Sequence, residues 1–422
     1  MTLTETAACG CPEGTALAAT RRSLLGAGAV AGASVVFGST VLTTIGGGAA
    51  AAAPATGAPV VVVVSLRGAA DGLSLAVPYG DPAYYAARPG IAVPKSALLA
   101  TDGFFGLHPA LAPLVPLWNA GKLAAVQATG LPVANRSHFS AMEELEDAAP
   151  GSAARVGWLN RMIGADQITG RLQAVAVGSS LPTSLLGPET VMSFRTLDAA
   201  VVAGADKWDT NGTRTRSLNS LWGAGGREMG TGMRTALGAV VDLDAAKKQE
   251  DRASTYPNSE LGRALSSTAR TLRADLGVTA VTIDTQSWDM HTGLGSATSG
   301  WMVRNATELA SAIAAFFTDL GPVADRVTLV TISEFGRRVQ ENANQGLDHG
   351  WGNVMFLAGA GVKGGKYYGT WPGLQNTLDA DLKVTTDYRS VLAEVVASRT
   401  TASTATVFPG FTRERVGVMV GQ

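Results

Sequence analysis

The chain has 422 residues, of which 46% are hydrophobic and 16% are charged, a balance that excludes an intrinsically disordered protein. Its 33 Lys and Arg residues offset 34 Asp and Glu residues, so the net charge of −1 provides no general attraction to nucleic acid or to an anionic membrane. Cys9 and Cys11 are the only cysteines, so a domain that begins after residue 53 has neither a disulfide scaffold nor a thiol nucleophile.

Two arginines, Arg21 and Arg22, precede an apolar stretch rich in Gly and Ala, and no further charged residue follows until Arg67. This pattern is similar to a twin-arginine (Tat) export signal, and Ala49 to Ala53 offer the small residues that signal peptidase requires. We expect residues 1–53 to be a Tat signal peptide with an Ala-rich tail. The Tat translocon would then export the protein to the periplasm, the cell wall or the medium, and no stable membrane span would remain after cleavage. The alternative is an uncleaved anchor, because the charge-free run is long enough to span a bilayer.

Residues 54–422 are expected to form a single α/β domain. Apolar and β-branched runs predict buried strands, and apolar positions at helical spacing predict helices between them. The alternation of the two indicates a mainly parallel sheet with helices on both faces, and the polar range 198–273 indicates a small helical cap insertion. The expected strands are 60–66, 123–128, 171–177, 278–283, 327–332 and 354–358, and the expected helices are 111–118, 307–320 and 390–398.

Polar residues cluster just after four of these strands, where parallel α/β sheets bind ligands. Three of the four histidines and several acids fall at this edge, and Asp, Glu and neutral imidazole are ligands for zinc, manganese and similar divalent ions. A Ser beside an Arg at the start of a helix is a candidate nucleophile with an anion-binding partner. The clusters contain Asp71; Arg136, Ser137 and His138; Asp289 and His291; Glu334 and Arg337; and Asp348 and His349.

Each cluster also has a purely structural interpretation. Asp71 with Gly72 is compatible with a plain turn, and Ser137 is compatible with a helix N-cap. His138 and His108 each have a structural alternative, and His108, followed by Pro109, is typical of the start of a helix. Glu334 and Arg337 have the spacing of a surface ion pair, which would contribute little. The clustering of all these residues at one sheet edge favours a functional site.

Other motifs in the chain do not lead to a function. The segment Gly359 to Gly364 matches GxGxxG after a strand, but no helix start follows to hold a pyrophosphate. There is no GxSxG elbow and no P-loop in the sequence. Tyr84, Tyr85 and the tryptophans are too scattered for a nucleic-acid stacking platform, so we expect no nucleic-acid partner.

Several segments together resemble the family of Tat-exported bacterial proteins with domain of unknown function 1501 (DUF1501). The resemblance extends from near Val60 to about Val396, and the range expected to be a cap matches poorly. The matching stretches are VVVVSLRGAADGLSLAVPYGDPAYYAARP, FGLHPALAPL, NRSHF, GWLNR, WDMH, SEFGRRVQENANQGLDHG, GGKYYGTWPGL and TTDYRSVLAEV.

That family is in turn distantly similar to the alkaline phosphatase and sulfatase superfamily. The similarity implies an alkaline-phosphatase-like fold, a metal-bound acid after the first strand, a hydroxyl nucleophile at a helix start and two later Asp/His groups. Asp71 matches the first acid, and Ser137 matches the nucleophile, with Arg136 beside it. The later groups match Asp289 with His291, Glu334 followed by Phe335, and His349 with adjacent Asp348. Phe335 stands where the superfamily has His, so a mononuclear or non-catalytic site is one alternative.

Two functions follow from these patterns. The first is an exported, metal-dependent hydrolase of phosphate or sulfate esters, with Ser137 as nucleophile and Arg136 stabilising negative charge. His291, Asp289 and His349 would hold one divalent ion (zinc, manganese or calcium), and Asp71 and Glu334 a second ion if two are present. The second function is a non-catalytic exported binding or assembly protein that keeps the scaffold and binds another exported protein.

Overall fold

The structure is a computed structural model that describes residues 34–37, 40–43, 56–149, 155–166, 170–202, 209, 211–223 and 228–422. Its main sheet has the strand order β1-β2-β8-β7-β9-β3-β10-β11-β6-β12, and β13 also pairs with β6. The strands are β1 (Ser34–Phe37), β2 (Thr40–Thr43), β3 (Val60–Leu66), β6 (Leu123–Gly130), β7 (Ala174–Val177), β8 (Val191–Phe194), β9 (Ala280–Thr285), β10 (Val327–Ile332), β11 (Asn353–Gly359), β12 (Lys366–Tyr368) and β13 (Thr386–Asp387). A small second sheet pairs β4 (Ala76–Val77) with β5 (Gly106–Leu107).

Strand β3 lies at the centre of the sheet and pairs in parallel with β9 on one side and with β10 on the other. Every residue of β3 is buried, which explains its unbroken run of valines: both faces of a parallel sheet are covered, so no position faces water. Two strands depart from the parallel direction: β11 runs antiparallel to both β10 and β6, and β2 runs antiparallel to both β1 and β8. The prediction of a mixed α/β fold with a mostly parallel sheet is confirmed.

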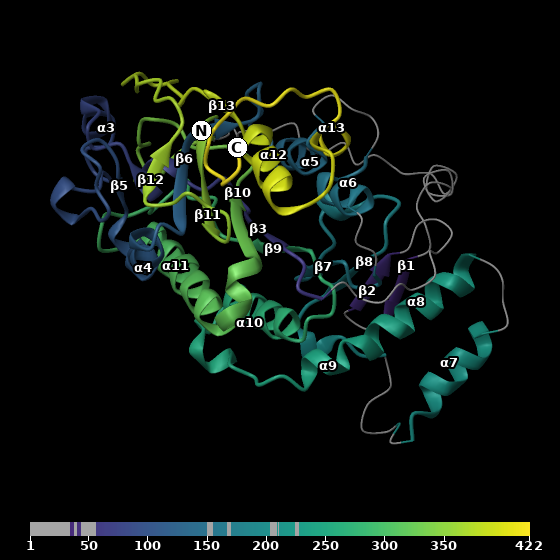
Figure 1. The fold of residues 1–422 in the computed structure, drawn as a ribbon. Coiled ribbons are helices and arrows are strands. Elements are labelled where there is room, and N and C mark those ends of the chain that lie inside the picture. The colour runs from purple at the N-terminus through teal and green to yellow at the C-terminus, as the bar shows by residue number, and fades with distance from the viewer. Residues whose placement is uncertain are drawn as a thin grey trace, which may run out of the picture.

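Helices cover both faces of the sheet (Figure 1). Val60, Val62 and Val64 of β3 pack in one core cluster with α10 (Glu260–Arg273) and α11 (Trp301–Leu320). The alternate residues Val61 and Val63 belong to a second cluster on the opposite face, because successive side chains of a strand point to opposite sides. That second cluster includes α5 (His138–Asp147), α6 (Trp158–Ala165), α12 (Tyr388–Arg399) and α13 (Thr404–Val407).

The remaining helices are short or peripheral. The expected helix 111–118 is divided into a 3-10 helix over Pro109–Leu114 and α4 (Val115–Asn119). His108 is the N-cap of the first piece and accepts a hydrogen bond from the Ala110 N–H, which fits its interpretation as a helix-start residue. The other short helices are α2 (Gly72–Leu75) and α3 (Pro82–Ala87).

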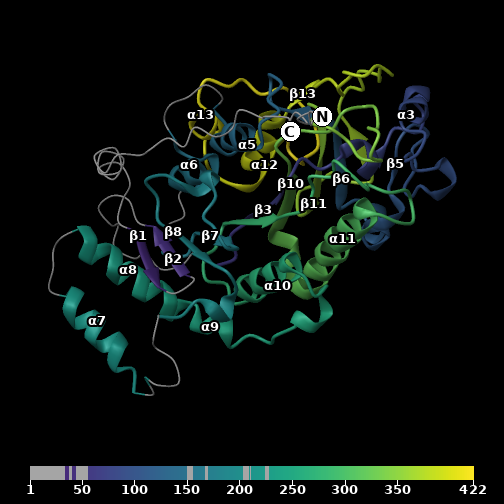
Figure 2. The same ribbon diagram turned by 180° about the vertical axis from the view of Figure 1, so that it is seen from behind.

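The range 198–273 contains α7 (Thr213–Gly223), α8 (Glu228–Asp242), α9 (Asp244–Lys247) and α10. Helix α10 contacts α11, β7 and β9, so this end of the range is part of the main helical layer beside the sheet. Helix α7 contacts α8 and lies at the periphery of the molecule in both views (Figures 1 and 2). The structure therefore describes helices in this range without establishing that they form a cap.

The predicted export signal, including Arg21 and Arg22, lies outside the described residues except for β1 and β2. These two strands form an antiparallel pair, and β2 pairs with the β8 edge of the sheet. Among the helices of the described ranges, none combines the length and the apolar character that crossing a bilayer requires.

Candidate metal centre

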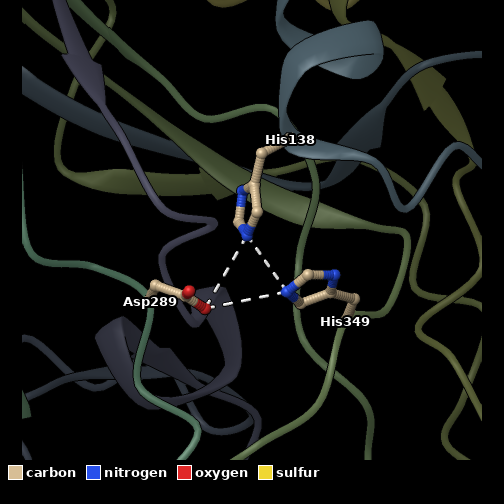
Figure 3. A group of neighbouring side chains, drawn as sticks. All are labelled: His138, Asp289 and His349. Atoms are coloured by element: carbon tan, nitrogen blue, oxygen red, sulfur yellow. Dashed lines mark hydrogen bonds and ion pairs between the residues drawn. The ribbon is translucent and has the colours of Figure 1, made fainter. Parts of the chain in front are cut away.

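The candidate site lies at the edge of the sheet where β3, β6, β9 and β10 end. His138 is the first residue of α5, which follows β6, and Asp289 lies four residues beyond the end of β9. His349 belongs to the connection between β10 and β11. Parallel strands bring these three connections to one edge, and Figure 3 shows the three side chains pointing toward a common centre.

His138, Asp289 and His349 form a group whose ligand atoms all lie within 4.8 Å of one another. The Nε2 atoms of His138 and His349 are 3.0 Å apart, and Asp289 Oδ1 lies 3.7 Å from the first and 3.6 Å from the second. Ligands about 2.0 Å from a tetrahedral zinc ion lie about 3.3 Å from one another. The separations therefore suit three ligands of a single ion.

His291 adds a fourth donor beside this group. Its Nε2 atom lies 3.0 Å from His349 Nε2 and 3.1 Å from Asp289 Oδ1. His291 thus adjoins two members of the group, and imidazole nitrogens with a carboxylate oxygen are ligands typical of zinc and related transition-metal ions.

The buried carboxylate of Glu334 determines which ring nitrogen of His138 faces the centre. Glu334 Oε1 lies 2.8 Å from His138 Nδ1 and also accepts the Gly68 N–H at 2.8 Å. Burial alone would raise the pKa of Glu334, but the hydrogen bonds from His138 and from backbone N–H groups hold this pKa below its ordinary value. The ionised carboxylate can only accept, so Nδ1 carries the proton and the Nε2 lone pair points inward.

The other two histidines are oriented in the same way. His349 Nδ1 lies 2.9 Å from the backbone carbonyl oxygen of Arg136, which is an acceptor only. His291 Nδ1 lies 3.0 Å from Asp348 Oδ1, and the Asn342 side chain also donates to this oxygen. Burial would raise the pKa of Asp348, but the hydrogen bonds from His291 and Asn342 lower it below its ordinary value. Metal-binding histidines ordinarily have such a partner behind the ring.

The Nε2 atom of His349 consequently faces the Nε2 lone pairs of His138 and His291, each at 3.0 Å, with no proton between them. A proton on one ring or a cation at the centre would relieve the repulsion. Burial lowers the pKa of His349, and the charge of Arg337 lowers it further, so protonation of this ring is unfavourable. The group formed by His138, Asp289 and His349 could therefore hold a metal ion.

Arg337 fixes the position of Asp289. Its guanidinium is buried and donates to Asp289 Oδ1 at 2.6 Å, to the Ala69 carbonyl oxygen at 2.7 Å and to the Leu347 carbonyl oxygen at 2.9 Å. Burial would raise the pKa of Asp289, but Arg337 lowers it overall, so this carboxylate is ionised and able to bind a cation. The ion pair that sequence spacing suggested, Glu334 with Arg337, is replaced by Arg337 with Asp289.

The six residues predicted as metal ligands lie in or beside the central group, behind its histidines, or away from it. Asp289 and His349 are in the central group, and His291 lies beside them. The carboxylates of Glu334 and Asp348 face the outer nitrogens of two histidines.

Asp71, the sixth predicted ligand, is engaged elsewhere. Its two carboxylate oxygens bind the buried Arg88 guanidinium at 2.5 and 3.0 Å, and one of them also caps α2 through the Ser74 N–H. The structure therefore does not bring Asp71 to the three imidazoles.

The predicted nucleophile, Ser137, is the N-cap residue of α5, directly before His138, and it is exposed. Its side chain makes no capping hydrogen bond, so the hydroxyl does not have the structural role that sequence suggested for it. The Arg136 guanidinium pairs with Asp381, while its carbonyl oxygen orients His349.

His138 itself was not among the residues predicted to bind metal. Its sequence signal was present: it is one of three histidines at strand ends in a chain with only four. Its ring and the His349 ring both pack against Phe335, with centroids 5.0 and 4.9 Å from the phenyl ring. Phe335 thus supports two imidazoles instead of supplying a ligand.

Two open cavities flank the group. His138 and Asp289 line one of about 600 Å³, together with Arg67, Phe139 and Glu146. His291 and His349 line the other, of about 550 Å³, which Arg136 and Arg338 also reach. Small molecules can therefore approach the centre from both sides.

Comparison with protein families gives one match, and no curated protein matches the chain. The model described as "Protein of unknown function (DUF1501)" matches residues 108–397, well over half of the sequence. This range contains His138, Asp289, His291 and His349. The chain belongs to the DUF1501 family.

Proposed function

We propose that this protein is an exported hydrolase of phosphate or sulfate esters that depends on a divalent metal ion. The observation that supports it most is the orientation of three imidazoles, each with an acceptor behind its Nδ1 atom and its Nε2 atom turned toward Asp289. The choice of ester chemistry rests on the resemblance of the sequence motifs to those of alkaline phosphatases and sulfatases.

The donor set favours one ion of the zinc or manganese type. Imidazole nitrogens suit these ions better than calcium, which prefers oxygen ligands. A second ion held by Asp71 and Glu334 has less support, because Arg88 binds Asp71 and the imidazole of His138 binds Glu334.

Ser137 is the proposed nucleophile. Attack by its oxygen on phosphorus or sulfur would release the alcohol and form an ester of Ser137, which water would then hydrolyse. A bound divalent ion would supply Lewis-acid stabilisation of the negative charge that develops on the ester oxygens. The N–H groups of the first turn of α5 and the Arg136 guanidinium would bind the same oxygens, since the partly exposed pair of Arg136 with Asp381 can exchange.

Metal analysis by mass spectrometry tests the metal assignment. The exported wild-type chain should hold about one ion, and Asp289→Ala and His349→Ala should lose it. His108→Asn is the matched control, because Asn can also accept the Ala110 N–H at this N-cap and the residue lies outside the group. A wild-type chain without metal after exposure to zinc, manganese and calcium would overturn the proposal.

Ester hydrolysis tests the catalytic assignment separately. Ser137→Ala should keep its metal and its fold but lose hydrolysis of phosphate and sulfate esters. Full activity in this variant would reject Ser137 as nucleophile. Bound metal without turnover of any ester in a broad panel would favour the other candidate, a non-catalytic binding or assembly protein.

Export is part of the proposal and depends on Arg21 and Arg22. Replacing both with Lys should leave the full chain in the cytoplasm, because the Tat pathway reads this pair. Cell fractionation of the wild-type and the double-Lys chains measures this. Equal export of both would show that another route is used.

A further inference from the structure

The 600 Å³ cavity beside His138 and Asp289 has an apolar wall. Phe139 lies on the first turn of α5, next to His138, and its side chain is 84% exposed. Met142, Leu181 and Pro182 line the same cavity. A large aromatic side chain left in water at the mouth of a polar site is a common feature of ligand-binding surfaces.

The rest of this cavity is acidic. Among the described residues of its lining, Arg67 is the one permanent cation, and one of its guanidinium nitrogens lies 2.5 Å from Glu146 and 3.1 Å from Asp284. Glu143 also lines the cavity, near its exposed rim, where it pairs with Arg155. An anionic group entering the cavity would therefore meet carboxylates and an arginine that is already paired.

The cavity on the other side of the centre differs in charge. Its described lining has two arginines, Arg136 and Arg338, beside three carboxylates, whereas the cavity beside His138 has one arginine beside five carboxylates. The three carboxylates are those of Glu341, Asp348 and Asp379. The Arg136 side chain is 42% exposed, against 20% for Arg67. Oxyanions of an ester would be accommodated better on this side, which leaves the acidic, partly apolar cavity for the remainder of the molecule.

From this asymmetry, and given the proposed hydrolase function, we infer that the alcohol part of the ester occupies the Phe139 cavity and is an apolar group without negative charge. Neutral or cationic aromatic alcohols satisfy both the apolar wall and the surplus of carboxylates. Esters of polyanionic alcohols, such as nucleotides with further phosphates, do not.

Binding of simple alcohol analogues tests the inference without turnover. Isothermal titration of the metal-loaded exported chain with 2-phenylethanol, 2-phenylethylamine and 3-phenylpropionate compares neutral, cationic and anionic phenyl compounds. The anion should bind about tenfold more weakly than the other two, a difference of about 1.4 kcal/mol. Equal affinity for all three would overturn the inference.

Two variants locate the effect in this cavity. Phe139→Ala should weaken the binding of 2-phenylethanol about fivefold and leave the metal content unchanged, because an aromatic contact is lost. Glu143→Lys should reduce the difference in affinity between 3-phenylpropionate and the other two compounds. The matched control is Leu221→Ala, which removes an exposed apolar side chain outside both cavities and should change neither value. An unchanged affinity in Phe139→Ala would also overturn the inference.

Phenyl phosphates bearing neutral, cationic or carboxylate substituents add the second readout. If the protein hydrolyses them, kcat/KM should follow the same order as binding. If it binds the neutral compounds with the expected preference but hydrolyses none, the hydrolase proposal fails while the assignment of the cavity holds. If the protein hydrolyses all of these phenyl phosphates equally well, the hydrolase proposal holds while the assignment of the cavity fails.

Discussion

Single hydrogen-bond acceptors determine how the histidines of the candidate metal centre are oriented. Glu334 faces His138 Nδ1, the Arg136 carbonyl oxygen faces His349 Nδ1, and each contact selects the tautomer whose Nε2 atom can bind a metal. Removing such an acceptor should change metal affinity although no ligand is lost.

Glu334→Gln retains an amide oxygen for the His138 N–H but loses the negative charge. We expect metal affinity to fall about tenfold in this variant, and nearer a hundredfold in Glu334→Ala, where the imidazole loses its partner and the Gly68 N–H its acceptor. Competition with a chromophoric chelator measures both values. Glu414→Gln, at an exposed position outside the site, is the control. Wild-type affinity in Glu334→Ala would show that the orientation of His138 does not matter.

The buried carboxyl group of Glu146 makes the free energy of unfolding depend on pH. Its side chain is 5% exposed, and burial raises its pKa from 4.5 to about 7, although Arg67 opposes the shift. The folded state thus binds this proton more tightly than the unfolded state, so the stability it contributes is complete below pH 4.5 and is lost as the pH rises through 7.

The comparison of wild type with Glu146→Gln isolates this group. Relative to the variant, the wild-type free energy of unfolding should fall by about 2 kcal/mol between pH 5 and pH 8. Urea unfolding of the metal-free chain at both pH values measures the difference. Parallel pH profiles for the two proteins would show that Glu146 titrates normally in the folded state.

The loop after β3 lies in close contact with the loop after β9. Gly68 has φ +108°, and a Cβ atom there would lie 2.5 Å from the Asp289 backbone nitrogen. Gly57 also has a positive φ, +75°, but a Cβ atom there would meet nothing within 4 Å. The two glycines therefore separate the effect of the contact from that of backbone conformation.

Gly57→Ala should destabilise the protein by about 1 kcal/mol and leave metal affinity unchanged, since only the left-handed backbone is penalised. Gly68→Ala should destabilise it by about 3 kcal/mol or more and weaken metal binding, because the Asp289 backbone has to move. Thermal unfolding and chelator competition measure the two effects. Equal results for the two variants would mean that the loops separate without affecting Asp289.

Burial explains which elements could be predicted from the sequence. Strands β3 and β10 have the expected bounds, 60–66 and 327–332, because both are uninterrupted buried runs. Strand β8 was not predicted, since its four residues, VMSF, show no period of their own. Helix α11 begins at Trp301, six residues before the expected start, because its first turns include the polar Arg304 and Asn305. The antiparallel direction of β11 depends on its neighbours, which a local pattern does not contain.

The same distinction applies to the site. Position after a strand was enough to predict Asp289, His291 and His349 as neighbours, since topology alone brings these segments together. The partner of a charged group depends on tertiary packing, so sequence spacing paired Arg337 with Glu334 whereas the structure pairs it with Asp289.

For the whole molecule, a bound metal ion would join three segments that are far apart in the chain: α5, the segment after β9 and the connection between β10 and β11. At about 100 times its Kd, an ion that binds only the folded state adds about 2.7 kcal/mol. For a domain of this size the Tm should rise by about 3 °C.

Differential scanning calorimetry with and without zinc measures this rise. Asp289→Asn should lose the rise, whereas His108→Asn should keep it. A rise of the same size in Asp289→Asn would place the stabilising ion elsewhere in the molecule.

The antiparallel direction of β11 has a consequence for how the protein can change. Because β10 ends and β11 begins at the same edge of the sheet, the connection formed by residues 333–352 starts and ends at that edge. It crosses neither face of the sheet. Arg337, Asp348 and His349 therefore belong to a single connection, which is held at both ends by buried neighbouring strands. Asn342 of this connection donates to Asp348 and to the His291 carbonyl oxygen, so changes here reach the candidate metal centre while the helical layers remain as they are. A change in this one stretch of sequence would therefore alter the surroundings of His291 and His349 together.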